Sequence, residues 1–467
     1  EEGGIPAPAP GPEPTLEGVA AELERERLFD IIRDLVDQHA PIRAKMLDLY
    51  NRYKTDDLPI LSRTFEDENK INRKLNNSFD SEIVDTKVGY FIGNPISYQV
   101  DEAQQGSEKV TATLSDFTLR NNIDDLDSET VKMATICGIA PRLLYIDRDG
   151  LERVMMVNPW EVILVYDRSI NEPQFALRYY DVTIKDGKEE KTKTRVEWYD
   201  DTTVTYYLED DNGDYVLDIS EPVNPQPHLF DLVPVIAFPN NEEYQGDAEK
   251  VLSLIDAYDR TLSDVNSEIE QFRLAYMAFY GYDPDEETLA RAKQTGAFGL
   301  DEKSEGVGIE FVTKDMNDQA IENHLNRLEN NIMRFGKTVN MTDENFSQNL
   351  SGVAIRYKLM ALETKCITME RKITAALRQQ FRVLATAWAK KGIPVDYTNI
   401  YFQFKRNLPV NLLDEAQSTV QLKGVVSERT RLSQLSFVDD VDWELEEMAK
   451  DNGFIDLDDE EDGDDTV

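Results

Sequence analysis

Two long stripes of apolar residues, separated by a segment of different texture, constrain the fold of this chain most. From Gly246 onward apolar residues recur at alternating steps of three and four, the spacing of one face of an α-helix. The first stripe comprises Val251, Leu254, Tyr258, Leu262, Val265, Ile269 and Phe272. The second comprises Ile321, Leu325, Leu328, Ile332, Phe335 and Val339. We predict two helices that pack against each other as a hairpin.

Three further segments belong to this helical half. Residues 274–314 combine two apolar pieces with a short helical pattern, which predicts a small α/β excursion at the end of the hairpin. The polar stretch "DENFSQNLSG" follows the second stripe. A long helix is predicted over 352–391 because Gly392 and Pro394 terminate the pattern. Its predicted buried side is Val353, Tyr357, Met360, Thr364, Ile367, Ile373, Leu377, Phe381, Leu384 and Trp388.

The first half of the chain favours a mixed structure. Residues 16–54 predict a helix, and its expected buried face is Leu23, Leu28, Ile31, Ile32 and Leu35. Between 80 and 240, short strand patterns alternate with turn dipeptides such as Asn212-Gly213, which is typical of antiparallel sheet. The run "VGYFIG" at 88–93 is interpreted as one of these strands. The fold class predicted is α+β.

The C-terminal part of the chain is predicted to be helical, and both ends are predicted to lack structure. Residues 411–452 predict three short helices, the first ending at Gly424, the second capped by Ser427 and the third by Asp439 or Asp440. Residues 1–15 are rich in Pro, Gly and Glu, and residues 453–467 form an acidic run. Neither end has enough apolar residues to bury, so both are predicted to be disordered.

Length and composition limit the class of protein. A chain of 467 residues is expected to form two or three regions with cores of their own. Its apolar runs stay well short of about 18 residues, and its N-terminus lacks the pattern of a secretion signal, so we expect neither a membrane protein nor a secreted one. Two cysteines far apart in the sequence, Cys137 and Cys366, indicate buried thiols in a reducing compartment.

The net charge is strongly negative. There are 50 basic and 91 acidic residues, which gives a formal charge of −41. Nonspecific affinity for nucleic acid comes from Lys and Arg side chains that displace counterions from phosphates. The charge therefore argues against ordinary nucleic-acid binding.

Residues that could carry chemistry are scattered. The three histidines, His39, His228 and His324, have no Cys or His at ligand spacing, so a zinc site is not expected. The acids around Asn212-Gly213, which are Asp210, Asp211 and Asp214, are interpreted as turn formers rather than metal ligands. We expect no metal, no cofactor and no enzymatic activity.

One segment imitates a phosphate-binding loop. Gly336, Lys337 and Thr338 match the end of such a loop, but Asn331 stands where its first glycine is required. The loop also needs a preceding strand, whereas the apolar stripe continues as a helix up to this point. We interpret the segment as the end of a helix.

Four blocks of sequence occur in order along the chain. They are "FDSEIVDTKVGYFIGNPISY" (79–98), "PVIAFPNNEEYQGDAEKVLSLIDAYDRTLSDVNSEIEQF" (234–272), "NLSGVAIRYKLMALETKC" (349–366) and "GVVSERTRLSQLSFVDDVDWELE" (424–446). Together they resemble the portal proteins of tailed bacteriophages, in the branch found in siphophages of Gram-positive hosts. The resemblance extends over roughly residues 40–450 with fitting segment lengths.

The resemblance implies a portal fold that assembles as a homo-oligomeric ring of twelve copies, or thirteen when purified. It assigns an antiparallel-sheet wing to 16–240, a long-helix stem hairpin to 246–273 and 315–338, and a small α/β clip to 274–314. It assigns a tunnel loop to 339–351, a long wing helix to 352–391 and a helical crown to 392–452.

The resemblance also implies a function. Such a ring occupies one capsid vertex of the virion, after assembly in the host cytoplasm, and double-stranded DNA is packaged and ejected through it. Terminase, a head-completion adaptor, and the major capsid and scaffolding proteins are the expected partners, and no membrane is involved. The tunnel-loop residues expected to contact DNA are Thr342, Asp343, Glu344, Asn345, Phe346, Ser347, Gln348 and Asn349.

The negative charge is compatible with this role. Acidic walls repel phosphate from all sides of a channel, and a neutral polar loop can touch the duplex without the salt-linked grip of Lys or Arg. Two alternatives remain open. One is a structural neck or tail adaptor ring that does not hold DNA during packaging, and the other is a nucleotide-dependent enzyme that uses Lys337.

Overall fold

The computed structural model describes residues 16–66, 70–100, 107–167, 172–186, 189–272, 276–280, 284–295, 308–312, 318–340, 352–407, 417, 419–433, 435, 438 and 441–458. The chain divides into two compact units, one within Glu1–Met341 and Leu359–Lys405, the other within Thr342–Lys358 and Arg406–Val467. The predicted N-terminal tail at 1–15, residues 459–467 of the acidic tail predicted at 453–467, and most of the predicted tunnel loop, residues 341–351, lie outside the described residues. Residues 453–458 of the predicted tail are helical.

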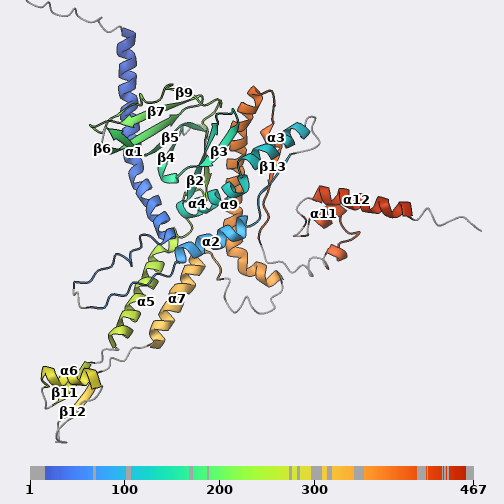
Figure 1. Ribbon diagram of the computed structural model, residues 1–467. Helices are drawn as coiled ribbons and strands as arrows, with labels where there is room; N and C mark the ends of the chain where they lie inside the picture. The colour runs from blue at the N-terminus through green and yellow to red at the C-terminus, as the bar shows by residue number, and fades with distance from the viewer. Residues whose placement is uncertain are drawn as a thin grey trace, which may run out of the picture. The chain divides into compact units, whose positions relative to one another are not determined.

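The larger sheet lies against the N-terminal helix α1 (Leu16–Lys54) (Figure 1). Its strands β4 (Val162–Tyr166), β5 (Pro173–Asp186), β6 (Glu189–Tyr199), β7 (Thr203–Glu209) and β8 (Tyr215–Leu217) follow in chain order, and β9 (Gln226–Pro227) also pairs with β7. Every pairing is antiparallel. From α1, Ile32 is fully buried among Leu177, Tyr179 and Val196, whereas Ile31 is 44% exposed. The predicted helix is present, and its buried face excludes Ile31.

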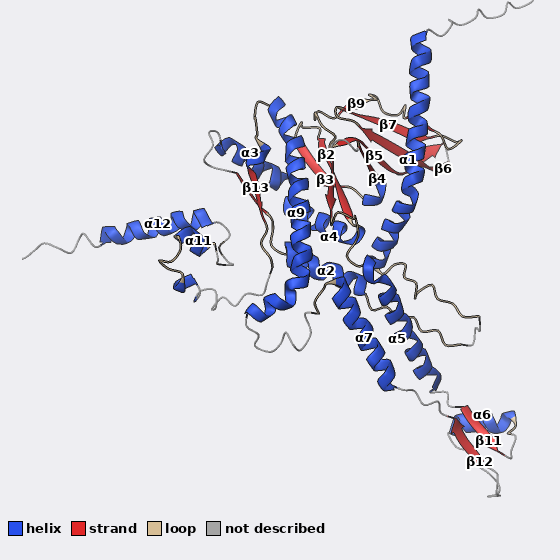
Figure 2. Ribbon diagram, turned by 180° about the vertical axis from the view of Figure 1, so that it is seen from behind, coloured by secondary structure: helices blue, strands red, loops and turns tan. Residues whose placement is uncertain are grey.

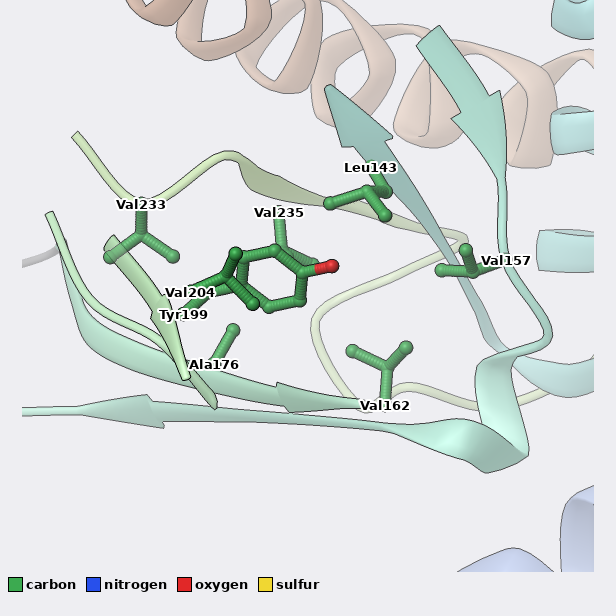
Figure 3. Packing of buried hydrophobic residues seen from close by; sticks show 8 residues of the cluster. All are labelled: Leu143, Val157, Val162, Ala176, Tyr199, Val204, Val233 and Val235. Carbon is green, nitrogen blue, oxygen red and sulfur yellow. The ribbon is translucent and has the colours of Figure 1, made fainter. Parts of the chain in front are cut away.

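A second, three-stranded sheet has the order β10 (Val235–Pro239), β2 (Ile139–Ile146) and β3 (Glu152–Met156). An apolar core joins residues of both sheets (Figure 3). It contains Leu143, Val157, Val162, Ala176, Tyr199, Val204, Val233 and Val235. The predicted turn at Gly213 has φ of +86°, and Gly150, in the turn after β2, has φ of +75°, the left-handed region that glycine enters without strain. The predicted antiparallel meander and the α+β class are therefore confirmed.

The helices α2 (Phe79–Ile92), α3 (Ser107–Arg120) and α4 (Ile123–Cys137) precede the sheets in the sequence. The prediction of a strand at 88–93 was wrong, because residues 88–92 are the end of α2. Short apolar runs do not distinguish a strand from a helix that is buried on several sides. Such burial is present here, since Ile83, Val84, Tyr90 and Phe91 are all buried.

The helical half begins with α5 (Leu252–Phe272), preceded by a short 3-10 helix at Glu249–Val251. The helix α7 (Asp318–Gly336) lies beside α5 in both views (Figures 1 and 2). Between them in the sequence are β11 (Tyr276–Tyr280), α6 (Glu286–Thr295) and β12 (Gly308–Val312), with β11 and β12 paired antiparallel. The elements of a hairpin carrying a small α/β insertion are thus present.

The long helix α9 (Gly352–Lys390) has the predicted length but not the predicted buried face in its first half. Leu359, Leu362, Cys366 and Met369 are buried there. Of the residues expected on that side, Tyr357 at 74%, Met360 at 64% and Ile367 at 39% are exposed, and the side chain of Val353 is not described. Helical spacing fits more than one stripe when apolar residues are frequent, so the pattern alone did not select the correct face.

The predicted crown at 392–452 contains a strand as well as helices. β13 (Ile400–Gln403) pairs antiparallel with β1 (Ser97–Val100), so residues up to Lys405 belong to the larger unit. In the smaller unit, α11 (Glu428–Leu432) begins after Ser427, whose Oγ accepts a hydrogen bond from the Thr430 N–H, as predicted. α12 (Val441–Asp458) extends six residues beyond the predicted limit of 452. Asp439 and Asp440 lie outside the described residues.

Candidate functional site in the α5–α7 hairpin

The hairpin has an apolar core at the end where α2 meets it. Val251, Ile255 and Ile332 are fully buried there against Phe79 and Ile83 of α2. Gly336 packs closely here, since a Cβ at that position would lie 3.3 Å from Ile83 Cδ1, closer than an ordinary van der Waals contact. The hairpin is therefore joined firmly to the rest of the larger unit.

The predicted hairpin residues are not buried equally. Val251, Leu325, Leu328 and Ile332 are buried, and Leu254, Tyr258, Leu262, Val265 and Ile321 are half-buried. Ile269 and Phe335 are 52% and 53% exposed, and the side chain of Phe272 is not described. The two stripes thus pack near α2, except for Phe335, and the stripe of α5 becomes exposed towards its C-terminal end.

A second buried stripe on α5 is polar. Asp259, Ser263 and Ser267 follow one another at steps of four and are buried, although Asp and Ser in a surface helix look like solvent-facing residues. They bind the backbone of residues 73–77. The Asn77 N–H donates to Asp259 Oδ1 (3.1 Å), the Leu75 N–H to Ser263 Oγ (2.9 Å) and the Arg73 N–H to Ser267 Oγ (3.0 Å).

The spacing of these contacts explains why the segment, which we call the 73–77 strap, runs antiparallel along the helix. Two residues of extended chain advance about 6.6 Å, and four residues of helix advance about 6 Å. Every second N–H of the strap therefore meets every fourth side chain of α5. The sequence signal for this was the small polar series at i, i+4 and i+8, which the apolar stripe obscured.

Four acidic side chains of α5 and of the residues just before it form ion pairs with cations of the same chain. Lys45 pairs with Glu249 (2.6 Å), Arg52 with Asp256 (2.9 Å), Arg63 with Asp264 (2.6 Å) and Arg73 with Glu270. Desolvation by burial raises the pKa of Asp259. The acidic face of this helix therefore anchors residues 45–77, and it is not an open negative surface of the kind expected from composition.

A buried ionic cluster connects the hairpin to α2 and α9. Lys87 Nζ lies 2.6 Å from Asn240 Oδ1 and 3.3 Å from Asp247 Oδ1. Lys365 Nζ lies 2.6 Å from Asp247 Oδ2, and it donates to the Gly336 carbonyl, also at 2.6 Å.

Burial and the neighbouring opposite charges together explain the pKa shifts in this cluster. Burial opposes the charge of Asp247, but the two lysines hold the pKa of this carboxyl below its usual range. Desolvation by burial lowers the pKa of Lys365. The cluster ties the end of α7, where the polar segment 339–351 begins, to the long helix α9. Its four elements are distant in sequence, so no local pattern revealed it.

The remaining candidate residues are those of the tunnel loop, of the segment that imitates a phosphate-binding loop, and of the acidic turn at Asn212-Gly213. Thr342 to Asn349 lie outside the described residues. Lys337 is exposed, with φ +50°, immediately after the end of α7, so a helix rather than a strand precedes the segment that imitates a phosphate loop. Asp210 Oδ1 accepts the N–H groups of Asn212 and Asp214, at 2.8 and 2.9 Å, as a turn former does.

Across the described ranges, no three His, Cys, Asp or Glu side chains are grouped as a metal site would require. Cys137 and Cys366 are both buried free thiols. Among the described helices, none combines the length and apolarity needed to cross a membrane.

Comparison with known proteins identifies the family. Residues 32–453 match the family described as "Phage portal protein, SPP1 Gp6-like", so the chain belongs to this family of phage portal proteins. The portal protein of Bacillus phage SPP1 is 27% identical over 474 residues, covering 94% of this chain and 90% of the relative. The portal protein of Clostridium phage phiCD119 is 27% identical over 402 residues, covering 80% and 85% of the two chains.

Proposed function

We propose that this protein forms a ring at one capsid vertex, and that double-stranded DNA is packaged and ejected through the channel of that ring. The observation that carries the proposal is the family match over 32–453, which includes the whole α5–α7 hairpin. Terminase, a head-completion adaptor, and capsid and scaffolding proteins are the partners proposed.

The parts of the portal are proposed from the elements. We infer that α5 and α7 form the stem, that β11, α6 and β12 belong to the clip, and that the two sheets with α1 form the wing. Residues 339–351 would be the tunnel loop, and α11 and α12 would belong to the crown. The binding of Lys365 to the Gly336 carbonyl supports a mechanical role, because it fixes the point where the proposed stem passes into the proposed loop.

The tunnel loop has a composition suited to a moving contact. Asn345, Ser347, Gln348 and Asn349 offer neutral hydrogen-bonding groups, and Phe346 offers one apolar contact. Such groups can touch a phosphate backbone without displacing counterions, so contact does not become tight binding.

A deletion of residues 343–349 tests the assignment of the loop. In particles assembled with the deleted protein, we expect rings of normal size, seen by electron microscopy, together with failed packaging or leakage of packaged DNA. The control deletion is 460–466, in the acidic tail. Normal packaging and retention by the 343–349 deletion would refute the role of the loop. A ring channel too narrow for a duplex in the same micrographs would favour the adaptor alternative.

A further inference from the structure

A cavity of about 340 Å³ lies between α3, the start of β3 and the C-terminal end of α9, all within the larger unit. Figures 1 and 2 both show α3 beside this part of α9. The lining of the cavity includes the apolar side chains of Ala112, Leu151 and Ile393 and the indole of Trp388. Ligand sites in proteins usually have volumes of about 300 to 1,000 Å³ and mostly apolar walls, so this cavity is large enough for a small organic molecule.

Trp388 gives this cavity a hydrogen-bond donor that is not satisfied. Only 2% of Trp388 is exposed, and its Nε1–H has no acceptor among the described residues. Its ring packs beside those of Phe117 and Phe381, with centroids 6.0 and 6.2 Å away, and neither of these side chains can accept a hydrogen bond in the plane of the indole. Because a buried indole N–H usually has a partner, the missing acceptor indicates a group supplied from the cavity.

The charged residues of the lining carry a small excess of positive charge. Glu152, which is 2% exposed, lies 2.5 Å from Lys391 and 3.5 Å from Arg120. Asp116 is also paired with Arg120. Both carboxylates therefore have cations already, whereas exposed Lys109 forms no ion pair within the described part of the chain. Three cations and two carboxylates leave the lining with one positive charge, in a chain whose formal charge is −41.

These features together select the chemical class of the ligand. A carboxylate has oxygen atoms that can accept from the Trp388 N–H, and its single negative charge offsets the single positive charge of the lining. A hydrocarbon portion would cover the apolar walls. Inorganic phosphate fits less well, because it has no apolar part and carries more negative charge beside Glu152 and Asp116. An organic cation fits less well, because both of these carboxylates are already paired.

We propose that this cavity binds a small organic monocarboxylate, whose carboxylate accepts a hydrogen bond from Trp388 Nε1 and whose hydrocarbon portion packs against Leu151 and Ile393. The bound molecule contacts both α3 and α9, so it strengthens the packing of these helices. The inference goes beyond the proposed function and does not depend on it, because the cavity is formed within one chain and outside the α5–α7 hairpin.

Isothermal titration calorimetry of the full-length chain tests the class of ligand, with hexanoate as the probe. We expect saturable binding at one site per chain. Hexanamide has nearly the same shape but no charge, and it should bind about tenfold more weakly, because hydrogen bonds to charged groups are the stronger ones. No binding of hexanoate, or equal affinity for hexanoate and either hexanamide or inorganic phosphate, would overturn the proposal.

A pair of bulky substitutions tests the location of the site. Ala112→Trp places a large side chain in the lining, and Thr111→Trp places the same side chain at the neighbouring position of α3, outside the lining. Both positions are exposed, so neither substitution enters the core. We expect Ala112→Trp to abolish the binding of hexanoate and Thr111→Trp to retain it. Binding that survives in Ala112→Trp, or is lost equally in both variants, would contradict the assignment to this cavity.

Two further substitutions test the groups that hold the carboxylate. Trp388→Phe removes the N–H and keeps an aromatic ring, and it should weaken the binding of hexanoate several-fold, whereas Trp443→Phe, at a 58% exposed position, should not. Because Trp388→Phe alters a buried residue, Lys109→Gln provides a measurement at an exposed position, with Lys250→Gln as the control of equal charge. We expect weaker binding in Lys109→Gln only. Unchanged affinity in both Trp388→Phe and Lys109→Gln, or unchanged affinity in Lys109→Gln where Trp388→Phe does not fold, would overturn the proposal.

Discussion

At the scale of single residues, His39 illustrates how burial changes the chemistry of a side chain that no sequence pattern had explained. It lies in α1 with its Nδ1 2.8 Å from the hydroxyl oxygen of Tyr179 on β5, and only 7% of the residue is exposed. Burial, with a smaller contribution from Arg43, lowers the pKa of His39 to about 4. The imidazole is therefore neutral in the folded protein at pH 7.

This shift predicts that stability falls with acidification. Below pH 6.5 the unfolded chain protonates His39 while the folded chain does not until about pH 4, so the unfolded state binds more protons. The resulting loss in the free energy of unfolding at pH 4 is about 2 kcal/mol after solvent screening is taken into account. We expect His39→Gln to show a smaller drop in melting temperature between pH 7 and pH 5 than the wild type, measured by calorimetry. His324→Gln, at an exposed position of α7, is the control, and an unchanged drop in His39→Gln would contradict the assignment.

At the scale of elements, the sequence identified the helices more reliably than the segments that pack against them. α5, α7 and α9 appear close to the expected limits, because long apolar stripes and terminal glycines are local signals. The 73–77 strap was not foreseen, since it depends on three hydrogen bonds between segments about 190 positions apart. The same holds for the face of α9, which is selected by Leu362, Cys366 and Met369 packing inward.

The strap can be tested through its hydrogen bonds. Ser263→Ala with Ser267→Ala removes the acceptors of the Leu75 and Arg73 N–H groups, at a cost of about 1 kcal/mol for each bond. We expect faster hydrogen–deuterium exchange of these two amides, while those of the β5–β6 sheet keep their protection. Ser253→Ala, at an exposed position of α5, should change neither. Unchanged exchange at residues 73 and 75 would show that the strap is held by other contacts.

At the scale of the whole molecule, charge governs how copies can approach one another. Each chain carries a formal charge of −41, which already counts the cations that form the ion pairs on α5. Copies brought together in a ring repel one another, and salt weakens this repulsion as the Debye length falls from about 30 Å at 0.01 M to about 8 Å at 0.15 M.

Ring assembly should therefore be favoured by salt. We expect the fraction of purified protein in rings to increase between about 0.01 M and about 0.15 M NaCl, as measured by sedimentation velocity. Sucrose at matched osmolality is the control, because it does not screen charge. A fraction that decreases with salt would mean that ion pairs between subunits outweigh the net repulsion.

The sequence by itself determined the class of this protein, its α+β composition, the positions of its long helices and its family resemblance, because periodicity, turn residues and ordered blocks are properties of neighbouring residues. Only the tertiary structure decided which polar groups are satisfied within the chain. It placed acids of α5 against Arg52, Arg63 and Arg73, and it left the Trp388 Nε1–H without an acceptor among the described residues. The reason is physical: electrostatic interactions depend on distance in space, and a net charge of −41 does not say which charges are already paired.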